Sequence, residues 1–340
     1  MHTRLSGVAF LLGAALLLAL VSAARPETAP ARGLLLVTNK GNHTLGIIDP
    51  ESGALLGSVD EGGITGHELA TSPDGKTAYV PIYGNSGVGA PGTDGRTLAL
   101  IDVPGRRLVK TFDFDRPLRP HCAVYNPKDG LLYVTTELAR SVTVMDPRTL
   151  QIVGSIPTDQ PESHMLAITH DGLRGYTSNV HVGTVTAIDL TTRKVIAVIP
   201  VSPHAQRISI SMDDRMAFTA DQTKPRLAVI DTATNRVASW VELAGLAYGT
   251  APTLDGRWLL VALPNEGKVA VVDLRSLQVA RTLDVPKSPQ EILVRPDGEV
   301  AYVSCHESRK VAALNLKTWK VDKIIEAGPM ADGMAWANGN

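Results

Sequence analysis

Short runs of alternating apolar and polar residues, bounded by Gly, Asp and Pro, repeat along the chain from residue 33 onward. Alternation with a period of two between such turn residues predicts antiparallel β-strands. The turns fix the repeat length, because Asp129, Asp171, Asp213, Asp255 and Asp297 follow one another at intervals of 42 residues. Each repeat contains four predicted strands, and four strands in about 42 residues is the pattern of a β-propeller blade.

The two ends of the chain together complete the last of seven blades. The first unit, over 33–60, has three predicted strands and lacks the fourth type, whereas an orphan strand of that type ends the chain at 332–338. Pairing this orphan strand with the first unit closes the ring and removes an exposed sheet edge. We therefore predict an all-β fold, a seven-bladed β-propeller of four-stranded antiparallel blades closed by the C-terminal strand.

The N-terminal residues have the pattern of a secretory signal peptide. Arg4 precedes an apolar run over 8–21, and small residues follow that run. A positive start, an apolar stretch and a small-residue cleavage site are its three parts. We predict a signal peptide over 1–23, a linker over 24–32 and a single propeller domain over 33–340. The mature protein is then periplasmic or secreted, with no membrane span after cleavage; a retained membrane anchor is the alternative.

Charge and cysteine content narrow the choice of partners. The chain has 33 Lys and Arg against 34 Asp and Glu, and nucleic-acid binders usually carry a clear basic excess. We expect no nucleic-acid partner, but a small molecule or a glycan, bound by a monomer. Cys122 and Cys305 lie far apart in the sequence, and we expect both to be free and buried.

Candidate site residues appear where the blades differ from one another. The start of each fourth-type strand, the innermost strand of a blade, lies at the mouth of the channel. At this position the seven repeats carry no aliphatic residue, and we name the set the mouth ring: His67, His121, His164, Gln206, Tyr248, Gln290 and Asp332. The loops between first and second strands reach the same face and carry polar groups: Tyr83, Glu137, Asn179, Asp221 and His306. A Gly-rich insertion, Gly84–Gly95, is expected to fold over the mouth as a lid.

Three histidines from successive blades predict a metal site. Imidazole is a common ligand of Zn, Cu, Fe and Mn, so His67, His121 and His164, with His306 across the ring, are the candidate ligands. The alternative is a polar, water-filled mouth in which these side chains only satisfy backbone groups and water. Tyr248 and Glu137 are the candidates for proton exchange. The candidates for ligand contact are Gln206, Tyr248, Gln290, Asp332, Tyr83, Arg119 and Arg207.

Motifs in the first strands of several blades resemble a known family. Leu36–Asn39, Tyr133–Thr136 and Tyr176–Asn179, with the Ser72–Gly75 turn, resemble the hallmark of the YVTN-repeat β-propeller family. The resemblance covers nearly the whole mature chain and implies a seven-bladed propeller. This fold is shared by secreted ligand-binding proteins, lactonases and haem d1 domains, so the resemblance leaves function open.

Three functional hypotheses follow, and whether the protein is an enzyme stays open among them. The first is an exported propeller that binds a small ligand or a metal ion at the His-rich ring. The second is a metal-dependent lyase or hydrolase, lactonase-like, acting on a sugar acid or a polysaccharide fragment. The third is binding of a haem d1-like tetrapyrrole. The sequence has no Gly-x-Ser-x-Gly elbow, Walker loop, dinucleotide fingerprint or Cys-x-x-Cys-His haem motif.

Overall fold

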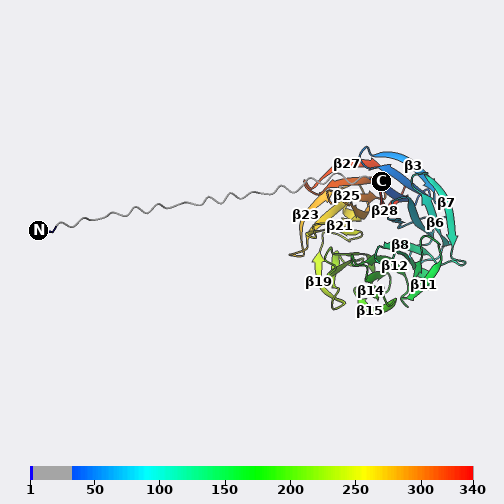
Figure 1. The fold of residues 1–340 in the computed structure, drawn as a ribbon, viewed down its shortest axis with the longest axis horizontal. Coiled ribbons are helices and arrows are strands. Elements are labelled where there is room, and N and C mark those ends of the chain that lie inside the picture. The colour runs from blue at the N-terminus through cyan, green and yellow to red at the C-terminus, as the bar shows by residue number, and fades with distance from the viewer. Residues whose placement is uncertain (3–32, 340) are drawn as a thin grey trace. The chain divides into compact units, whose positions relative to one another are not determined.

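The computed structural model describes residues 1–2 and 33–339. It confirms the predicted fold, since seven four-stranded antiparallel sheets are arranged as blades around a ring (Figure 1). The predicted signal peptide and linker fall within residues 3–32, outside the described part, except for the first two residues. Within the described part, helices with the length and apolar character needed to cross a membrane are absent.

Each blade has four strands, which are counted from here on from the channel outward. The fourth-type strand of the sequence pattern is therefore the innermost strand, and the first-type strand is the second. The innermost strands are β4 (Ala70–Thr71), β8 (Pro120–Asn126), β12 (Ser163–Ile168), β16 (Ala205–Ile210), β20 (Thr250–Pro252), β24 (Pro289–Val294) and β28 (Ala331–Asn338). The second strands are β1 (Gly33–Asn39), β5 (Thr77–Gly84), β9 (Leu131–Thr136), β13 (Arg174–Asn179), β17 (Met216–Asp221), β21 (Trp258–Leu263) and β25 (Val300–Cys305). The third strands are β2 (Thr44–Asp49), β6 (Asp94–Asp102), β10 (Ser141–Met145), β14 (Thr184–Asp189), β18 (Arg226–Asp231), β22 (Lys268–Asp273) and β26 (Lys310–Asn315). The outermost strands are β3 (Ala54–Asp60), β7 (Arg107–Asp113), β11 (Ile152–Pro157), β15 (Lys194–Pro200), β19 (Arg236–Glu242), β23 (Gln278–Asp284) and β27 (Lys320–Glu326).

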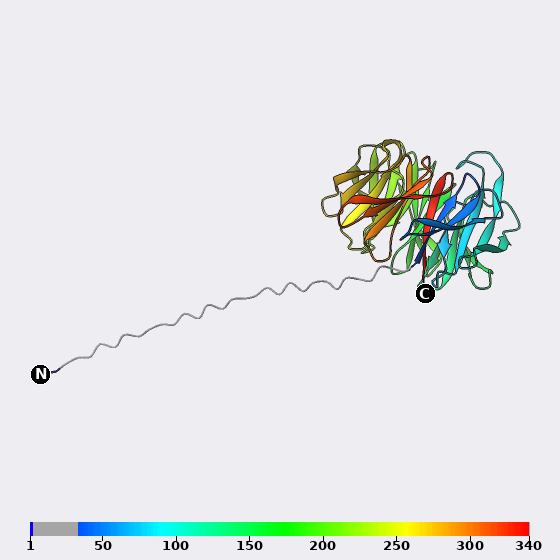
Figure 2. The same ribbon diagram turned by 90° about the horizontal axis from the view of Figure 1, so that it is seen from above.

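The two ends of the chain meet in one blade, as the sequence predicts. Strand β28 pairs antiparallel with β1, with Leu35 opposite Trp336 and Val37 opposite Met334. Figure 2 shows this C-terminal strand, in red, beside the blue strands of the N-terminus. The closed ring has no unpaired inner edge at the junction of first and last repeats.

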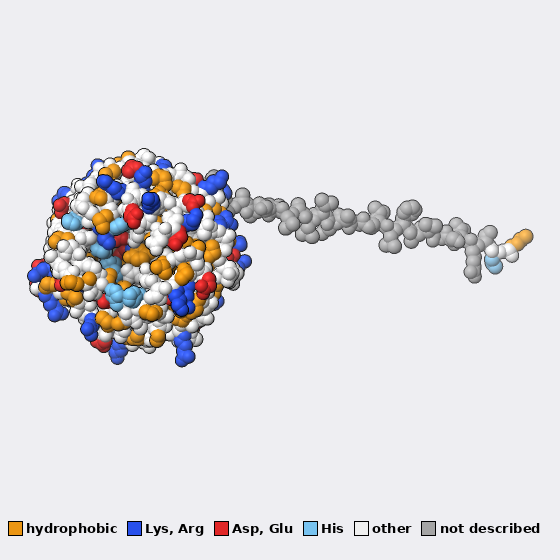
Figure 3. All heavy atoms as spheres, turned by 180° about the vertical axis from the view of Figure 1, so that it is seen from behind, with side chains coloured by type: hydrophobic (Ala, Val, Ile, Leu, Met, Phe, Trp, Pro, Cys, Tyr) orange, Lys and Arg blue, Asp and Glu red, His pale blue; other side chains and the backbone are white. Residues whose placement is uncertain are grey.

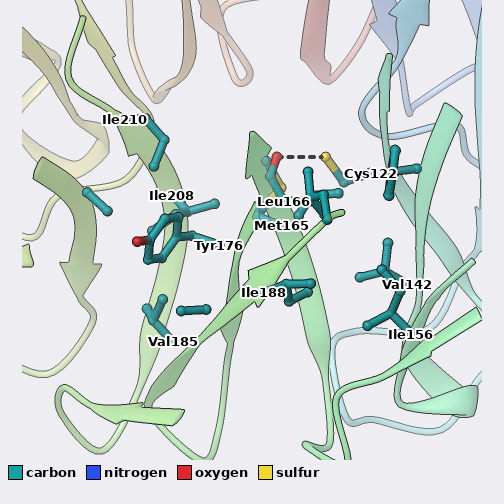
Figure 4. Close-up of a cluster of buried hydrophobic side chains, with 14 of the residues drawn as sticks. Cys122, Val142, Ile156, Met165, Leu166, Tyr176, Val185, Ile188, Ile208 and Ile210 are labelled. Atoms are coloured by element: carbon teal, nitrogen blue, oxygen red, sulfur yellow. Dashed lines mark hydrogen bonds between the residues drawn. The ribbon is translucent and has the colours of Figure 1, made fainter. Parts of the chain in front are cut away.

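Apolar side chains fill the spaces between neighbouring blades. In one cluster, Cys122 packs near Tyr176 and Leu166, and its Sγ lies 3.6 Å from the Leu166 carbonyl oxygen (Figure 4). Cys122 and Cys305 are both free and buried, which confirms the expectation from the sequence. Burial raises the pKa of each thiol to about 12. Buried thiols of this kind are structural and poorly reactive.

The innermost strands are irregular at their mouth ends. Their pairing register shifts at Pro120/Ala123, Ser163/Met165, Gln206/Ser209 and Pro289/Ile292. An extra residue in a strand breaks the strict alternation of faces and re-aims side chains. Arg207, which has a positive φ of 62°, lies in one of these irregular stretches. Consequently a residue that follows a mouth-ring position can also face the channel.

A short turn follows β9 and carries one of the candidate residues. The 3₁₀ helix η1 (Glu137–Ala139) ends at Arg140, which has a left-handed conformation with φ of 50°. A second such turn, η2 (Pro264–Glu266), ends at Gly267 with φ of 60°. The tight turn of η1 holds Glu137 buried and leaves Arg140 exposed.

Candidate functional site

The three predicted histidines lie together at the mouth. His121 and His164 are the second residues of β8 and β12, and His67 lies shortly before β4. The rings of His121 and His164 stack with centroids 3.5 Å apart, and His67 lies 4.7 Å from His121. His121 Nε2 is 3.1 Å from His67 Nδ1. We name these three residues the histidine cluster.

Two members of the histidine cluster are held neutral. Burial lowers the pKa of His67 well below its ordinary value, and the Lys40 ammonium group lowers it further. Burial also lowers the pKa of His121, with a smaller contribution from His164. A neutral imidazole keeps one nitrogen lone pair free for a proton or a metal. The Nδ1 atom of His121 is buried and has no hydrogen-bond partner among the described residues.

Glu137 borders the histidine cluster on one side. It accepts a hydrogen bond from the Tyr83 hydroxyl at 2.6 Å and one from Arg119 at 2.9 Å. Its Oε2 lies 3.4 Å from His164 Nδ1. Burial pushes the pKa of Glu137 upward, but the hydrogen bonds of His164, Tyr83 and Arg119 lower it overall. Glu137 is therefore a buried carboxylate at neutral pH.

Asp332 borders the histidine cluster on the other side. Its carboxylate lies 3.2 Å from Arg207, 3.3 Å from Lys40 and 3.6 Å from His67 Nδ1. Burial raises the pKa of Asp332, yet the charges of Lys40 and Arg207 lower it overall. Lys40, which is not among the residues predicted from the sequence, directly follows β1, whereas Tyr83, predicted in a loop, lies near the end of strand β5 in the next blade.

Two further carboxyl groups, the buried Glu68 and the half-buried Glu291, are not among the residues predicted from the sequence. Glu68 accepts a hydrogen bond from Arg207 and is hydrogen-bonded to Glu291, whose pKa is raised by burial and by the Glu68 charge. Glu291 also accepts a hydrogen bond from the Met334 backbone N–H at 2.6 Å. Glu68, Arg207 and Glu291 each follow a mouth-ring residue. They can be found in the sequence by listing the residue that follows each mouth-ring position.

Three further mouth-ring residues contact one another or a residue of their own loop: Gln206, Tyr248 and Gln290. Gln206 donates a hydrogen bond to the Tyr248 hydroxyl at 3.2 Å, and the Arg207 guanidinium lies 4.6 Å from the centre of the Tyr248 ring. Gln290 donates to Ser288 at 3.1 Å. His306 is half-buried, and burial lowers its pKa while the Asp332 charge opposes this effect. Tyr248 therefore contacts Gln206 and Arg207, and Arg207 joins this pair to Asp332.

Two polar loop residues of the predicted mouth face have structural roles. Asn179 is buried and hydrogen-bonds Ser163 at 2.8 Å and Thr184 at 2.9 Å. Asp221 is also buried, accepts hydrogen bonds from the backbone and side chain of Thr223, and pairs with Arg226 at 2.9 Å. Asn179, the last residue of β13, thus cross-links β12 and β14, and Asp221, the last residue of β17, satisfies the turn that follows it.

The Gly-rich insertion, which we name the strap (Gly84–Gly95), is fastened to the neighbouring blades. Arg119 is buried and donates hydrogen bonds to Asp94 at 2.6 Å and to the Ala90 carbonyl oxygen at 2.7 Å. The same guanidinium binds Glu137. A cavity of about 340 Å³, which we name the strap cavity, is lined by Gly89, Ala90, Pro91, Arg119, Glu137, Leu138, Arg140, Pro161 and Glu162. The strap therefore lies beside Glu137, and both line the strap cavity.

On one face of the propeller, histidine side chains gather in and around a hollow, beside acidic side chains (Figure 3). Over residues 1–2 and 33–339, no three His, Cys, Asp or Glu side chains already surround a point in a way that holds a metal ion. His121 Nε2 nevertheless lies 3.1 Å from His67 Nδ1, and His67 Nδ1 lies 3.6 Å from Asp332 Oδ2. Three of the four predicted metal ligands, His67, His121 and His164, are therefore close together, no contact of His306 with them occurs among the described residues, and metal binding stays a prediction.

Comparison with known proteins supports the fold. No protein-family model matches the sequence, and no curated protein matches it. Kuenenia stuttgartiensis hydrazine synthase is structurally similar, with a TM-score of 0.70 and 16% identity over 89% of this chain and 100% of the other. A functionally unknown protein from Desulfotomaculum acetoxidans DSM 771 has a TM-score of 0.74 and 13% identity, over 91% of this chain and 100% of its own. At these identities the likeness shows a common fold alone, and the chain is a seven-bladed β-propeller.

Proposed function

We propose that this exported propeller binds a transition-metal ion at the histidine cluster. The observation that carries the proposal is the approach of His67 Nδ1 to His121 Nε2, at 3.1 Å, between two imidazoles held neutral by burial. Two nitrogen ligands of a tetrahedral zinc ion, with bonds of about 2.0–2.1 Å, lie roughly 3.4 Å apart. The two ring nitrogens are therefore already close to the spacing that a shared metal ion requires.

The surrounding carboxylates support the same proposal. Asp332 Oδ2 lies 3.6 Å from His67 Nδ1 and 3.3 Å from Lys40 Nζ, so it is the nearest carboxylate oxygen to the two nitrogens and the candidate for a third ligand. Glu137 lies 3.4 Å from His164 Nδ1 and fixes that ring, which stacks on His121. Carboxylates beside imidazoles orient the rings and raise their basicity at metal sites.

The burial of the histidine cluster decides what size of ligand it admits. His121 and His164 are only 2% and 3% exposed, and the carboxylates of Asp332 and Glu137 lie beside the histidine cluster. A single ion fits between such side chains, whereas a glycan needs a larger opening. A bound metal supplies a Lewis acid. The hypotheses of a lyase or hydrolase and of tetrapyrrole binding stay predictions.

Metal titration of chelator-treated protein tests the proposal. Calorimetry with Zn²⁺ or Co²⁺, checked by elemental analysis, should give about one ion per chain. His121→Gln and Asp332→Asn should each weaken binding by tenfold or more. His170→Gln is the matched control, because His170 is exposed and pairs with Asp214 instead. Metal content below a tenth of an equivalent after reconstitution, or unchanged affinity in His121→Gln, would refute the proposal.

A further inference from the structure

The strap cavity has the size of a site for a small molecule. Its volume of about 340 Å³ lies near the lower end of the range of ligand sites, about 300–1,000 Å³. Pro91, Leu138 and Pro161 give it apolar wall, and charged and backbone groups give it polar wall. Such a mixed lining suits a molecule of about monosaccharide size that has both polar and apolar faces.

The strap forms one wall of this cavity and is held in place by two sets of contacts. Arg119 binds Asp94 and the Ala90 carbonyl oxygen. On the far side Gly89 has a φ of 65° and approaches Glu162 so closely that a Cβ atom there would lie 2.2 Å from Glu162 Oε1. The positive φ of this residue favours glycine, because other residues adopt it only with strain. The position of the strap is therefore defined by specific contacts.

The charges that line the strap cavity are all paired except one. Arg119 and Glu137 bind each other, and Glu162 binds His181 at 2.6 Å. The Arg140 guanidinium forms no hydrogen bond or ion pair among the described residues. Its backbone N–H binds the Glu137 carbonyl oxygen at 3.0 Å, so one tight turn holds both residues. The exposed Arg140 guanidinium is therefore available to a ligand, and arginine can bind a carboxylate through two parallel hydrogen bonds.

We propose that the strap cavity binds a small organic carboxylate of about monosaccharide size. Arg140 pairs with its carboxylate, and Glu162 and the strap backbone accept hydrogen bonds from its hydroxyl groups. Glu137 forms the wall that separates this ligand from His164. The cavity and its charges do not depend on a metal in the histidine cluster, so the two proposals stand separately.

Calorimetry on chelator-treated full-length protein tests this site with defined probes. Glucuronate should bind saturably, whereas glucose, which lacks the carboxylate, and acetate, which lacks the size, should each bind at least about tenfold more weakly. Arg140→Gln should weaken glucuronate binding by about tenfold, and Arg140→Lys should restore part of the loss. Arg116→Gln removes an exposed cation outside the cavity and should leave the affinity unchanged.

Two glycine variants of the strap test the place of binding. Gly89→Ala strains the left-handed backbone of the strap and crowds Glu162 Oε1, so it should lower the affinity for glucuronate, whereas at Gly87 an added Cβ meets only Ala90 at 3.5 Å. Gly87→Ala should therefore bind like the natural chain. Absence of saturable glucuronate binding, equal binding of glucose or acetate, or an unchanged affinity in Arg140→Gln would overturn the proposal. Metal binding is measured separately on the same preparation. None of these outcomes bears on the metal site proposed at the histidine cluster.

Discussion

Replacing Arg119 with Met removes the guanidinium that joins the strap to Glu137. The wild-type side chain is 7% exposed and donates to Asp94 at 2.6 Å, to the Ala90 carbonyl oxygen at 2.7 Å and to Glu137 at 2.9 Å. Met has a similar length and fills the space without a charge. After the change, Glu137 keeps the Tyr83 hydroxyl and His164 as neighbours but loses its only arginine partner at contact distance among the described residues.

The expected cost follows from the burial of the two partners. Glu137 is 2% exposed in its side chain, and breaking a buried ion pair by removing one partner costs about 3–5 kcal/mol. Asp94, the other acidic partner of Arg119, is 29% exposed and regains water when it is freed. We therefore expect Arg119→Met to lower the free energy of unfolding by about 3 kcal/mol at pH 7, the lower end of this range.

The pH dependence of this loss has a defined sign. The pKa of Glu137 in the folded protein lies below its ordinary value of 4.5, despite burial, because of His164, Tyr83 and Arg119. Its carboxylate therefore contributes stability above that ordinary pKa, and the contribution disappears as pH falls through the lowered value. The difference in the free energy of unfolding between Arg119→Met and the natural chain should therefore become smaller below about pH 4.

Urea unfolding followed by circular dichroism measures the effect. Glu137→Gln alone and the double variant complete a double-mutant cycle. The cost of the double variant should fall at least about 1 kcal/mol short of the sum of the single variants, because the two side chains are in contact. Additive costs, or a loss below about 1 kcal/mol in Arg119→Met, would refute the stabilising role of the Arg119–Glu137 ion pair.

Three further predictions concern buried titratable groups. Cys122 and Cys305, with pKa values raised to about 12 by burial, should not react with a disulfide reagent at pH 8 until the protein is unfolded; fast reaction of the folded protein would contradict this. Burial raises the pKa of Glu61 to about 7, so its contribution to stability is present below its ordinary pKa of 4.5 and is lost as pH rises through 7. Urea unfolding of Glu61→Gln should show a weaker loss of stability over this range, and an unchanged slope would argue against the assigned pKa. The imidazole NMR signals of His67 and His121 should not titrate between about pH 6 and 8, and midpoints near 6.5 would show that they are not held neutral.

The fold was predictable because its signal is repeated along the chain. The blades carry the same turn and strand pattern, at a spacing of 42 residues from Asp129 onward, so an error in one repeat is corrected by the others. The closing strand was predicted to begin at Asp332, and β28 begins one residue earlier at Ala331. The spacing also places His121, Gln206 and Gln290 at the same position of their innermost strands.

The candidate site was predictable only in part, because contacts across a ring leave no periodic trace in the sequence. The repeat spacing finds His67 and Asp332, but the approach of Lys40 to Asp332 depends on how blades at the two ends of the chain meet. Glu68 and Glu291 escaped because strict strand alternation directs them away from the channel. The bulges at the mouth ends of innermost strands overturn that alternation, as they do at Gln206/Ser209.

Anomalous diffraction from crystals soaked in Zn²⁺ tests the central claim most directly, because it locates the ion itself. The account predicts one strong peak between His67 Nδ1 and His121 Nε2, close to the Asp332 carboxylate, and loss of this peak in His121→Gln. A peak confined to the exposed His170 or His181, or no peak in the channel mouth, would contradict it.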